Sequence, residues 1–343
     1  IPAYPAAERA VRALAEAVRY AEWRREAAEP GRVPEYEGID EPGAATLIGR
    51  LLGTAAPEAP DSPARPEASG RRPAGAEGPA RADGPDRSGR PGGPGGPGGT
   101  GRPDRSGRPV AVPERGITLA PADARELLAR YGIAVHPVLP APDPDAAVRA
   151  AARLGYPVAL KTTAPHLRHR PDLGGVRLDL ATEQQLRTAY AELTEALGRP
   201  AELRPVVQAM VPRGVDTVVR AALDPAVGAV LSFGLAGAPS ELLGDTAHRL
   251  VPATDRDVAE QIRAIRTAPL LFGWRGSAPV DTAALEELLL RVSRLVDDHP
   301  EVVAVALEPV VVAPRGLAVL DATVRLAPPA ARTDLGPRRL PSY

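Results

Sequence analysis

From about residue 117 onward the sequence predicts an α+β fold, and two observations lead to this class. Apolar residues recur at helical spacing in several segments, while short runs rich in valine, leucine and alanine have the length and composition of strands. Helices and strands alternate along part of the chain, but several strand-like runs also follow one another over short links. Strands joined by short links pair antiparallel, because a parallel pair needs a long crossover. We therefore expect helices packed on antiparallel sheets and not a purely parallel sheet.

The expected elements follow one another closely along the chain. Gly132 and Gly155 close the first two helices, because glycine readily adopts the left-handed conformation that ends a helix. Thr182 followed by Gln185 is a capping-box pattern and opens a third helix. Helices are expected at 121–131, 145–154, 182–197, 255–266 and 282–296, and strands at 133–137, 157–162, 176–180, 206–211, 215–223, 229–233, 302–312 and 317–326.

Residues 1–53 precede this fold and contain two expected helices. Apolar residues recur at helical spacing from 6 to 28, and a second short apolar helix covers 43–52. So few residues cannot bury an independent core. We expect this segment to be the C-terminal tail of a larger upstream domain, and the start at Ile1 without a methionine to mark a fragment or a processed form.

Residues 54–115 have the composition of a linker. The stretch "RPGGPGGPGGTGRPDRSGRP" has almost no large apolar side chain, and "DRSGRP" occurs twice in the segment. Such a segment buries too little surface to offset its ordering entropy, so we expect it to be disordered. Its arginines could also bind polyanions, although a solvated tether is the simpler interpretation. A disordered tail is likewise expected at 328–343.

Composition excludes several classes of protein. With no cysteine, the chain has no disulfide framework, no thiolate metal site and no cysteine nucleophile. A net charge of −1 provides no global field that would attract nucleic acid or an anionic membrane. No apolar run approaches the ~20 residues of a membrane helix, and the start of the chain does not have the pattern of a signal peptide. We expect a cytoplasmic protein that binds neither nucleic acid nor membrane.

Lys161 is the only lysine among 42 basic residues, in a chain that also lacks asparagine. We attribute this usage to drift in a GC-rich genome, which replaces lysine by arginine. The surviving lysine ends an apolar strand in "YPVALKTTAP", where a compact ammonium can grip phosphate oxygens in a way that a guanidinium cannot. We interpret Lys161 as a functional residue; the alternative is a chance survivor on the surface.

A polar segment follows Lys161 and ends in a glycine pair. It contains His169, and Gly174 with Gly175 would allow a ligand to approach the backbone closely. Histidine can form a covalent phospho-intermediate, and neighbouring arginines can stabilise phosphoryl charge. From the residues alone, an ordinary polar loop before a strand is the stronger interpretation of this segment.

Glu308 and Asp321 lie on or near the last two expected strands. Two carboxylates on neighbouring strands can share a Mg²⁺ ion that bridges ATP phosphates. Without further context, two solvated acids are the stronger alternative. Gly-rich stretches at 234–237 and 273–276 could also touch phosphate, since Gly-rich turns present backbone amides to anions.

A series of segments, taken together, resembles one family of proteins. The segments, in order, are "DARELLARYGIAV", "GYPVALK", "HRPDLGGVRLDL", "VVQAM", "GVDTVV", "DPAVGAVLSFGLAG", "ELLGDTAHRLVP", "PLLFGWRG", "EPVVV" and "GLAVLDA". They resemble the ATP-grasp domain of ADP-forming (NDP-forming) acetyl-CoA or acyl-CoA synthetases, which is related to the β subunit of succinyl-CoA synthetase. The resemblance runs from about Leu119 to Leu326 and places the domain at 116–327. The opening segment of the chain resembles the end of the CoA-ligase domain of these synthetases.

The resemblance implies a two-lobed ATP-grasp fold that holds ATP between two α+β lobes, with ATP and Mg²⁺ as cofactors. Lys161 matches the lysine that holds the ATP phosphates. Gln208 matches the position where the hinge backbone meets adenine. Asp216, Gly174 and Gly175 are assigned to ATP binding on the same resemblance.

The resemblance also implies a phosphate relay and a metal site. His169 matches a histidine proposed to relay phosphate between ADP and a phosphohistidine of an upstream domain. Asp321 matches a Mg²⁺-binding aspartate, and Glu308 stands at the second metal position. The chain would then be the ATP-side half of an enzyme that converts ATP, an organic acid and CoA to ADP, phosphate and acyl-CoA. Its partners would be an upstream CoA-binding, phosphohistidine-carrying domain of the same polypeptide, with CoA and the organic acid as substrates.

Four positions depart from the pattern of this family. Asp216 stands where the family usually has glutamate, Ala236 interrupts a Gly-Leu-Gly-Gly run, and an Asp-x-Asn-Pro motif reads Ala306-Leu-Glu308-Pro. Glutamate is a competent Mg²⁺ ligand, but the two alanines have no polar group. The four departures favour a second hypothesis: a catalytically decayed, nucleotide-binding regulatory domain of a fused GNAT-type lysine acetyltransferase. A third hypothesis, that the chain only binds other proteins through its linker, requires the site matches to be accidental.

Overall fold

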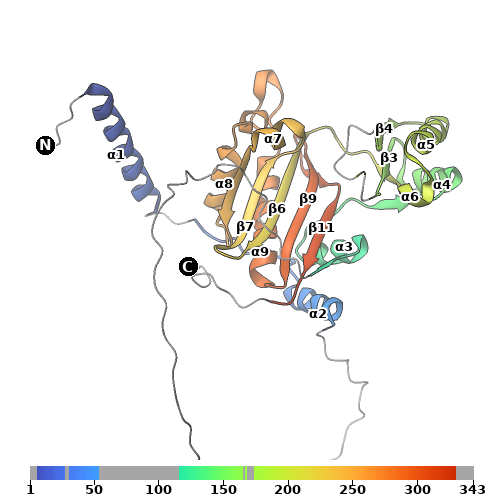
Figure 1. Ribbon diagram of the computed structural model, residues 1–343, viewed down its shortest axis with the longest axis horizontal. Coiled ribbons are helices and arrows are strands. Elements are labelled where there is room, and N and C mark those ends of the chain that lie inside the picture. Colours follow the sequence, from blue (N-terminus) through green and yellow to red (C-terminus); the bar gives the residue numbers. More distant parts are fainter. Residues whose placement is uncertain (1–5, 28–30, 54–115, 165–166, 168–173, 330–343) are drawn as a thin grey trace, which may run out of the picture. The chain divides into compact units, whose positions relative to one another are not determined.

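The structure is a computed structural model, and it describes residues 6–27, 31–53, 116–164, 167 and 174–329. His169, the segment 54–115 and most of the tail at 328–343 lie outside the described residues. In the described part, two antiparallel sheets each carry helices on one face (Figure 1). The α+β class expected from the sequence is confirmed.

The larger sheet is formed by strands from both ends of the domain. Its order is β1-β11-β9-β6-β7-β8, with β10 also paired to β9, and every pairing is antiparallel. β9 is the longest strand and lies between β6 and β11. The bounds are β1 Ile117–Thr118, β6 Val215–Asp224, β7 Gly228–Leu235, β8 Thr246–Leu250, β9 Val302–Val312, β10 Leu317–Val319 and β11 Ala322–Leu326.

Helices α3 (Pro121–Arg130), α8 (Asp255–Ala264) and α9 (Thr282–Asp298) contact the larger sheet. Leu231 and Phe233 of β7 are fully buried in one core with Ile262 of α8 and Leu289 of α9. Alternate residues of a strand point to opposite faces, so the neighbours of Leu231 and Phe233 lie on the other face of the sheet. That face carries the candidate site described below.

The smaller sheet has the order β2-β5-β3-β4, and α4 and α5 contact its strands. The predicted cap of α5 is present, since the hydroxyl of Thr182 accepts a hydrogen bond from Gln185 N at 3.2 Å. Oε1 of the Gln185 side chain accepts a hydrogen bond from Ala181 N at 2.8 Å. The bounds are β2 Val138–Pro140, α4 Pro144–Leu154, β3 Val158–Thr162, β4 Val176–Leu180, α5 Glu183–Leu197, α6 Pro200–Leu203 and β5 Pro205–Ala209.

Two expected strands differ in the structure, and several short elements were not expected. The strand expected at 133–137 lies at Val138–Pro140, because Pro137 has no amide hydrogen and cannot join a regular ladder. The strand expected at 317–326 is interrupted between β10 and β11. β8 was not expected from the sequence. It is an edge strand with one buried residue, so its sequence lacks the apolar run by which the other strands were predicted. The remaining short elements are α7 Ala238–Leu243 and the 3-10 turns Ala268–Leu270 and Trp274–Gly276.

The N-terminal segment contains the two expected helices, α1 (Ala7–Ala27) and α2 (Glu41–Leu52). α2 packs against α3, and its Leu47 and Ile48 are buried in the same core as the larger sheet. Asp40 accepts a hydrogen bond from Gly43 N at 2.9 Å at the start of α2, and it pairs with Arg130 at the end of α3. Residues 31–53 are therefore part of the larger lobe. Their assignment to the tail of an upstream domain stays a prediction.

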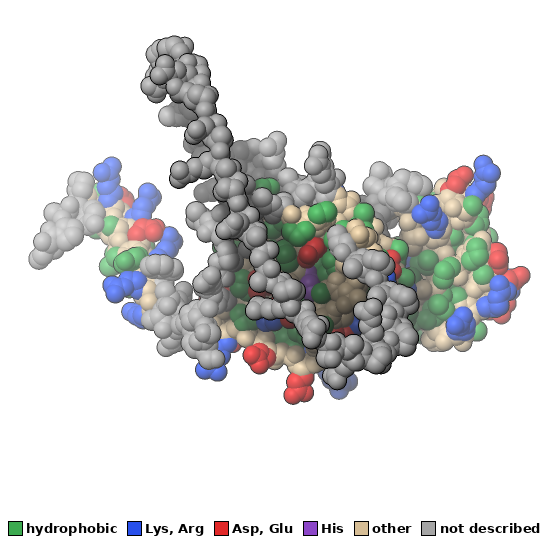
Figure 2. All heavy atoms as spheres, turned by 90° about the horizontal axis from the view of Figure 1, so that it is seen from below, with side chains coloured by type: hydrophobic (Ala, Val, Ile, Leu, Met, Phe, Trp, Pro, Cys, Tyr) green, Lys and Arg blue, Asp and Glu red, His purple; other side chains and the backbone are tan. Residues whose placement is uncertain are grey.

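Charged side chains of both signs are interspersed over the described residues of the face shown in Figure 2. None of the helices in the described part of the chain is both long and apolar enough to cross a membrane.

Candidate functional site

Lys161 is the last residue but one of β3 in the smaller sheet, where its side chain is partly buried. Removal of water around the ammonium lowers the pKa of Lys161, while the nearby carboxylates of Asp321 and Asp216 raise it in part. Asp216 lies on β6 of the larger sheet, and Asp321 lies between β10 and β11 of the same sheet. Two carboxylates of the larger sheet thus stabilise the charged form of a lysine in the smaller sheet.

Gln208 is the hydrogen-bonding centre of this arrangement. It lies on β5, is 1% exposed, and its Oε1 accepts a hydrogen bond from the Lys161 ammonium. Its Nε2 donates to the carbonyl oxygens of Leu320 at 3.1 Å and His136 at 3.3 Å. Because an ammonium only donates and a carbonyl only accepts, these three partners together determine the orientation of the amide. Gln208 therefore joins the smaller sheet to the break between β10 and β11.

The break between β10 and β11 takes Asp321 out of the regular ladder. Leu320 N donates to the Pro309 carbonyl at 3.0 Å, and Glu308 N donates to the Asp321 carbonyl at 3.1 Å. The Asp321 side chain is exposed, and its Oδ1 accepts from Ala322 N at 2.8 Å. Asp321, in the interruption that the sequence did not predict, is one of the two carboxylates whose charge acts on Lys161.

Asp216 lies near the start of β6 and is exposed as a residue. Desolvation of its carboxylate nonetheless raises the pKa of Asp216, and the Lys161 ammonium partly offsets this effect. The carbonyl of Asp216 accepts a hydrogen bond from Ala236 N at 2.9 Å. This backbone contact does not depend on the side chain at 236, so the alanine there leaves the local geometry of β6 and β7 intact.

Glu308 does not stand free beside Asp321. Nη2 of Arg220 lies 2.6 Å from its Oε2, and the Glu308 side chain is 19% exposed. Arg220 lies opposite Ala306 in the β6–β9 register, so it reaches Glu308 along one face of the sheet. Among the described residues, no group of three or more histidine or carboxylate side chains is arranged to hold a metal ion. Asp321 fits a Mg²⁺ contact, but Glu308 as placed does not, because a guanidinium already neutralises its carboxylate.

The open face of the larger sheet carries polar residues that sequence reasoning missed. Ser232 lies opposite Arg220 in the β6–β7 register and opposite His248 in the β7–β8 register. Its hydroxyl is 2.8 Å from Nδ1 of His248, and desolvation lowers the pKa of His248. One feature of the sequence could have indicated this polar face. Arg220 is a charged residue between the apolar pairs Val218-Val219 and Ala221-Ala222 in an expected strand.

Gly174 and Gly175 lie directly before β4, beside Lys161. A Cβ atom at Gly175 would come within 2.7 Å of Thr162 Cγ2, and the Gly175 carbonyl accepts from Thr162 N at 2.9 Å. Gly174 has a φ of 70°, which disfavours any side chain there. The described contacts of Gly175 hold β4 close to the strand that carries Lys161.

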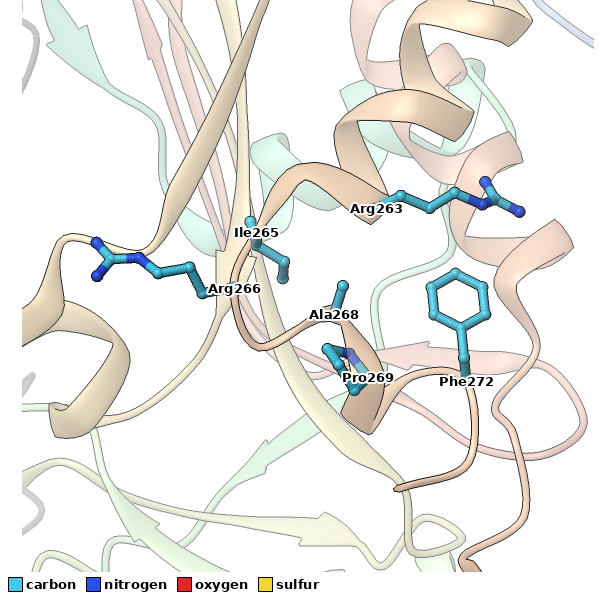
Figure 3. Close-up of a pocket in the computed structure, with 6 residues that line it drawn as sticks. All are labelled: Arg263, Ile265, Arg266, Ala268, Pro269 and Phe272. Carbon is cyan, nitrogen blue, oxygen red and sulfur yellow. The ribbon is translucent and has the colours of Figure 1, made fainter. Parts of the chain in front are cut away.

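A hollow of about 550 Å³ lies away from these residues, beyond the end of α8. It is lined by Arg263, Ile265, Arg266, Ala268, Pro269 and Phe272 (Figure 3). Arg263 stacks over the Phe272 ring, with 5.1 Å from its guanidinium carbon to the ring centroid. No residue singled out from the sequence as a site residue lines this hollow.

The structure thus brings Lys161, Gln208, Asp216 and Asp321 together, and it places Glu308 in an ion pair beside them. These features define a class of protein: a domain of two antiparallel α+β lobes with a lysine and carboxylates where the lobes meet, an arrangement suited to a phosphate-bearing ligand. The chain belongs to the ATP-grasp domain family, whose sequence profile matches residues 111–326. Enzymes of this family use ATP and Mg²⁺.

Several relatives of the chain are ADP-forming acid–CoA ligases. It is 39% identical over 212 residues to ADP-forming acetate–CoA ligase I of Archaeoglobus fulgidus, covering 61% of this chain and 31% of that protein. It is 32% identical over 196 residues to the β subunit of ADP-forming acetate–CoA ligase I of Pyrococcus furiosus, covering 56% of this chain and 84% of the subunit. The chain therefore spans about a third of the Archaeoglobus protein but most of a β subunit.

Solved structures agree with this placement. The chain resembles the dinucleotide-forming acetyl-coenzyme A synthetase 1 of Ca. Korarchaeum cryptofilum in complex with coenzyme A, Ca-AMPCP and HgCl⁺, with a TM-score of 0.55 and 32% identity. The alignment covers 61% of this chain and 93% of that chain. Another structure of that synthetase contains coenzyme A and Mg-AMPPCP, and aligns with a TM-score of 0.51 and 32% identity.

Proposed function

We propose that this chain is the ATP-binding half of an ADP-forming acyl-CoA synthetase. The observation that supports the proposal most is the position of Lys161, which is partly buried, is hydrogen-bonded to Gln208, and feels the charges of the Asp321 and Asp216 carboxylates. A lysine that is oriented by a buried partner is suited to grip phosphate oxygens. The full reaction would convert ATP, an organic acid and CoA to ADP, phosphate and acyl-CoA, and we place it in the cytoplasm.

Each residue of the site has a proposed role. Lys161 binds the nucleotide phosphates, and Gln208 holds the ammonium in position. Asp216 lies where it can orient the ammonium or the nucleotide, and Gly175 keeps β4 close to β3. Asp321 is the contact for Mg²⁺, an ion that neutralises charge on the phosphates when bound. The phosphate relay through His169, and transfer to a CoA-binding domain of the same polypeptide, are proposed on the family resemblance.

Calorimetry of Mg·ATP binding to the full chain tests the nucleotide site. Lys161→Ala removes a charged phosphate contact and should weaken binding about tenfold or more. Arg199→Ala is the matched control, because it removes an arginine whose side chain is 86% exposed and whose nearest acid is 3.7 Å away. The proposal would be contradicted if wild type and Lys161→Ala bound Mg·ATP with equal affinity, or if neither bound it.

A second function is favoured by one observation, the ion pair between Arg220 and Glu308. If Glu308 cannot serve the metal, the domain can bind nucleotide without turning it over. It would then regulate another domain, such as a fused GNAT-type lysine acetyltransferase. Acid-labile phosphate on the chain after incubation with ATP distinguishes the two functions: its presence requires phosphoryl transfer to this chain, whereas nucleotide binding without phosphorylation supports the regulatory function.

A further inference from the structure

We propose that Arg220 withdraws Glu308 from the metal site, so that the affinity of this domain for divalent ions is held low by its own guanidinium. The inference deepens the proposed function and rests on it, because it concerns the ion that would accompany the nucleotide. Asp321 would then hold Mg²⁺, while Glu308 remains paired with Arg220.

The first support is the contact itself. An arginine Nη2 at 2.6 Å from a carboxylate oxygen is a short, charge-assisted hydrogen bond. Glu308 is only 19% exposed, so its carboxylate has lost much of its hydration and needs a cationic partner. Arg220 supplies that partner from the adjacent strand, opposite Ala306. The pair is built by the register of β6 and β9.

The second support is the short distance between the backbones of Glu308 and Asp321. Glu308 N donates to the Asp321 carbonyl at 3.1 Å, so the backbone of Asp321, in the break between β10 and β11, lies directly beside Glu308 on β9. A metal ion at Asp321 would therefore meet the guanidinium near Glu308. A like charge nearby opposes binding of a further cation, just as a nearby charge of opposite sign favours the charged form of a carboxylate.

The third support is the exposure of the arginine. The Arg220 side chain is 49% exposed while its partner is mostly covered, so Arg220 can be removed with little change in packing. Its loss leaves Glu308 as a partly buried acid without this partner, beside Asp321. Two such acids with adjacent backbones supply oxygen ligands of the kind that Mg²⁺ and Mn²⁺ accept.

Titration of the full chain with Mn²⁺ without nucleotide, followed by electron paramagnetic resonance, tests the inference. Arg220→Ala should bind Mn²⁺ about tenfold more tightly than wild type, since an opposite charge at this range changes the cation affinity of a carboxylate by about one power of ten or more. Arg220→Gln removes the charge but keeps a donor, and should gain affinity in the same direction even if the alanine variant folds poorly. Arg220→Ala combined with Glu308→Gln should lose the gain. Arg263→Ala, on α8, is a control for net charge and should not change Mn²⁺ affinity.

Unchanged or weaker Mn²⁺ binding by both folded single variants would overturn the inference. Calorimetry with ATP separates this outcome from failure of the proposed function. If ATP binds through Lys161 but removal of Arg220 leaves Mn²⁺ affinity unchanged, only the inference fails. If Arg220→Ala gains Mn²⁺ affinity while none of the variants binds ATP, the ion-pair inference holds and the proposed function fails.

Discussion

The buried amide of Gln208 accepts a hydrogen bond from the Lys161 ammonium and donates one to the Leu320 carbonyl at 3.1 Å. One side chain thus couples the lysine to the strand break that exposes Asp321. The position of the ammonium and the connection between the two sheets depend on the same residue. Changes at Gln208 should therefore affect stability and nucleotide affinity together.

Gln208→Leu should destabilise the fold by about 2 kcal/mol or more, because it leaves the Lys161 ammonium and two carbonyl groups without a buried partner. Urea unfolding of the two proteins measures this change. Gln184→Leu, at an exposed position of α5, is the matched control and should stay within about 0.5 kcal/mol of wild type. A Gln208 variant as stable as the control would show that the amide network contributes nothing.

The pH dependence of nucleotide binding should report Lys161 directly. Desolvation lowers the pKa of Lys161, so its ammonium loses the proton at a lower pH than an ordinary lysine, and nucleotide affinity should fall as pH rises through that value. Lys161→Arg keeps its charge throughout and should show a flat profile, whatever its absolute affinity. Calorimetry from pH 7 to about pH 10 measures both. Parallel profiles for the two proteins would contradict the assignment.

The stability of the fold should change with pH in the opposite direction. The folded pKa of Lys161 lies below the unfolded value, so between the two values the unfolded chain binds more protons than the folded one. The Lys161 contribution to the free energy of unfolding therefore rises with pH in that window. Comparison with Lys161→Met by denaturant unfolding isolates this contribution, which should be absent in the variant.

Gly175→Ala should destabilise the smaller lobe by about 1–3 kcal/mol, because its Cβ would lie 2.7 Å from Thr162 Cγ2. Thr162→Ser removes that methyl group and keeps the hydroxyl that donates to the Leu203 carbonyl at 2.6 Å. In the Thr162→Ser background, Gly175→Ala should therefore be much better tolerated. A double-mutant cycle measures the coupling, and strict additivity would show that this contact is not the constraint.

Leu47→Ala in α2 should cost about 2–5 kcal/mol of stability, the usual range for a buried leucine, although this residue lies before the family match at 111–326. Arg50→Ala on the same helix is the control, since its side chain is 65% exposed. Thermal unfolding of the full chain measures both changes. If Leu47→Ala behaves like the control, α2 does not belong to the folded core.

The sequence predicted the α+β class, most elements and the candidate lysine, because these depend on local patterns. Apolar spacing locates α8 and α9, and the composition of the chain singles out Lys161. The network around Lys161 depends on contacts that no local pattern contains. Gln208 forms hydrogen bonds with three residues that are separated from it by 47, 72 and 112 positions in the sequence. Arg220 pairs with Glu308 over a separation of 88 positions. Glu308 was taken as a metal ligand from its place in a motif, and its ion pair becomes visible only when β6 and β9 are set in register.

The docking of α2 has a consequence for the segment at 54–115. One end of this segment follows α2, whose Leu47 is buried in the core, and the other end precedes β1, which pairs with β11. Residues 53 and 116 therefore belong to one folded body, so the chain between them starts and ends on that body. The entropy of loop closure grows only with the logarithm of length, about 0.6 kcal/mol for each doubling. The fold should thus accept large insertions or deletions in this segment, and a chain cut there should stay associated through α2 and α3.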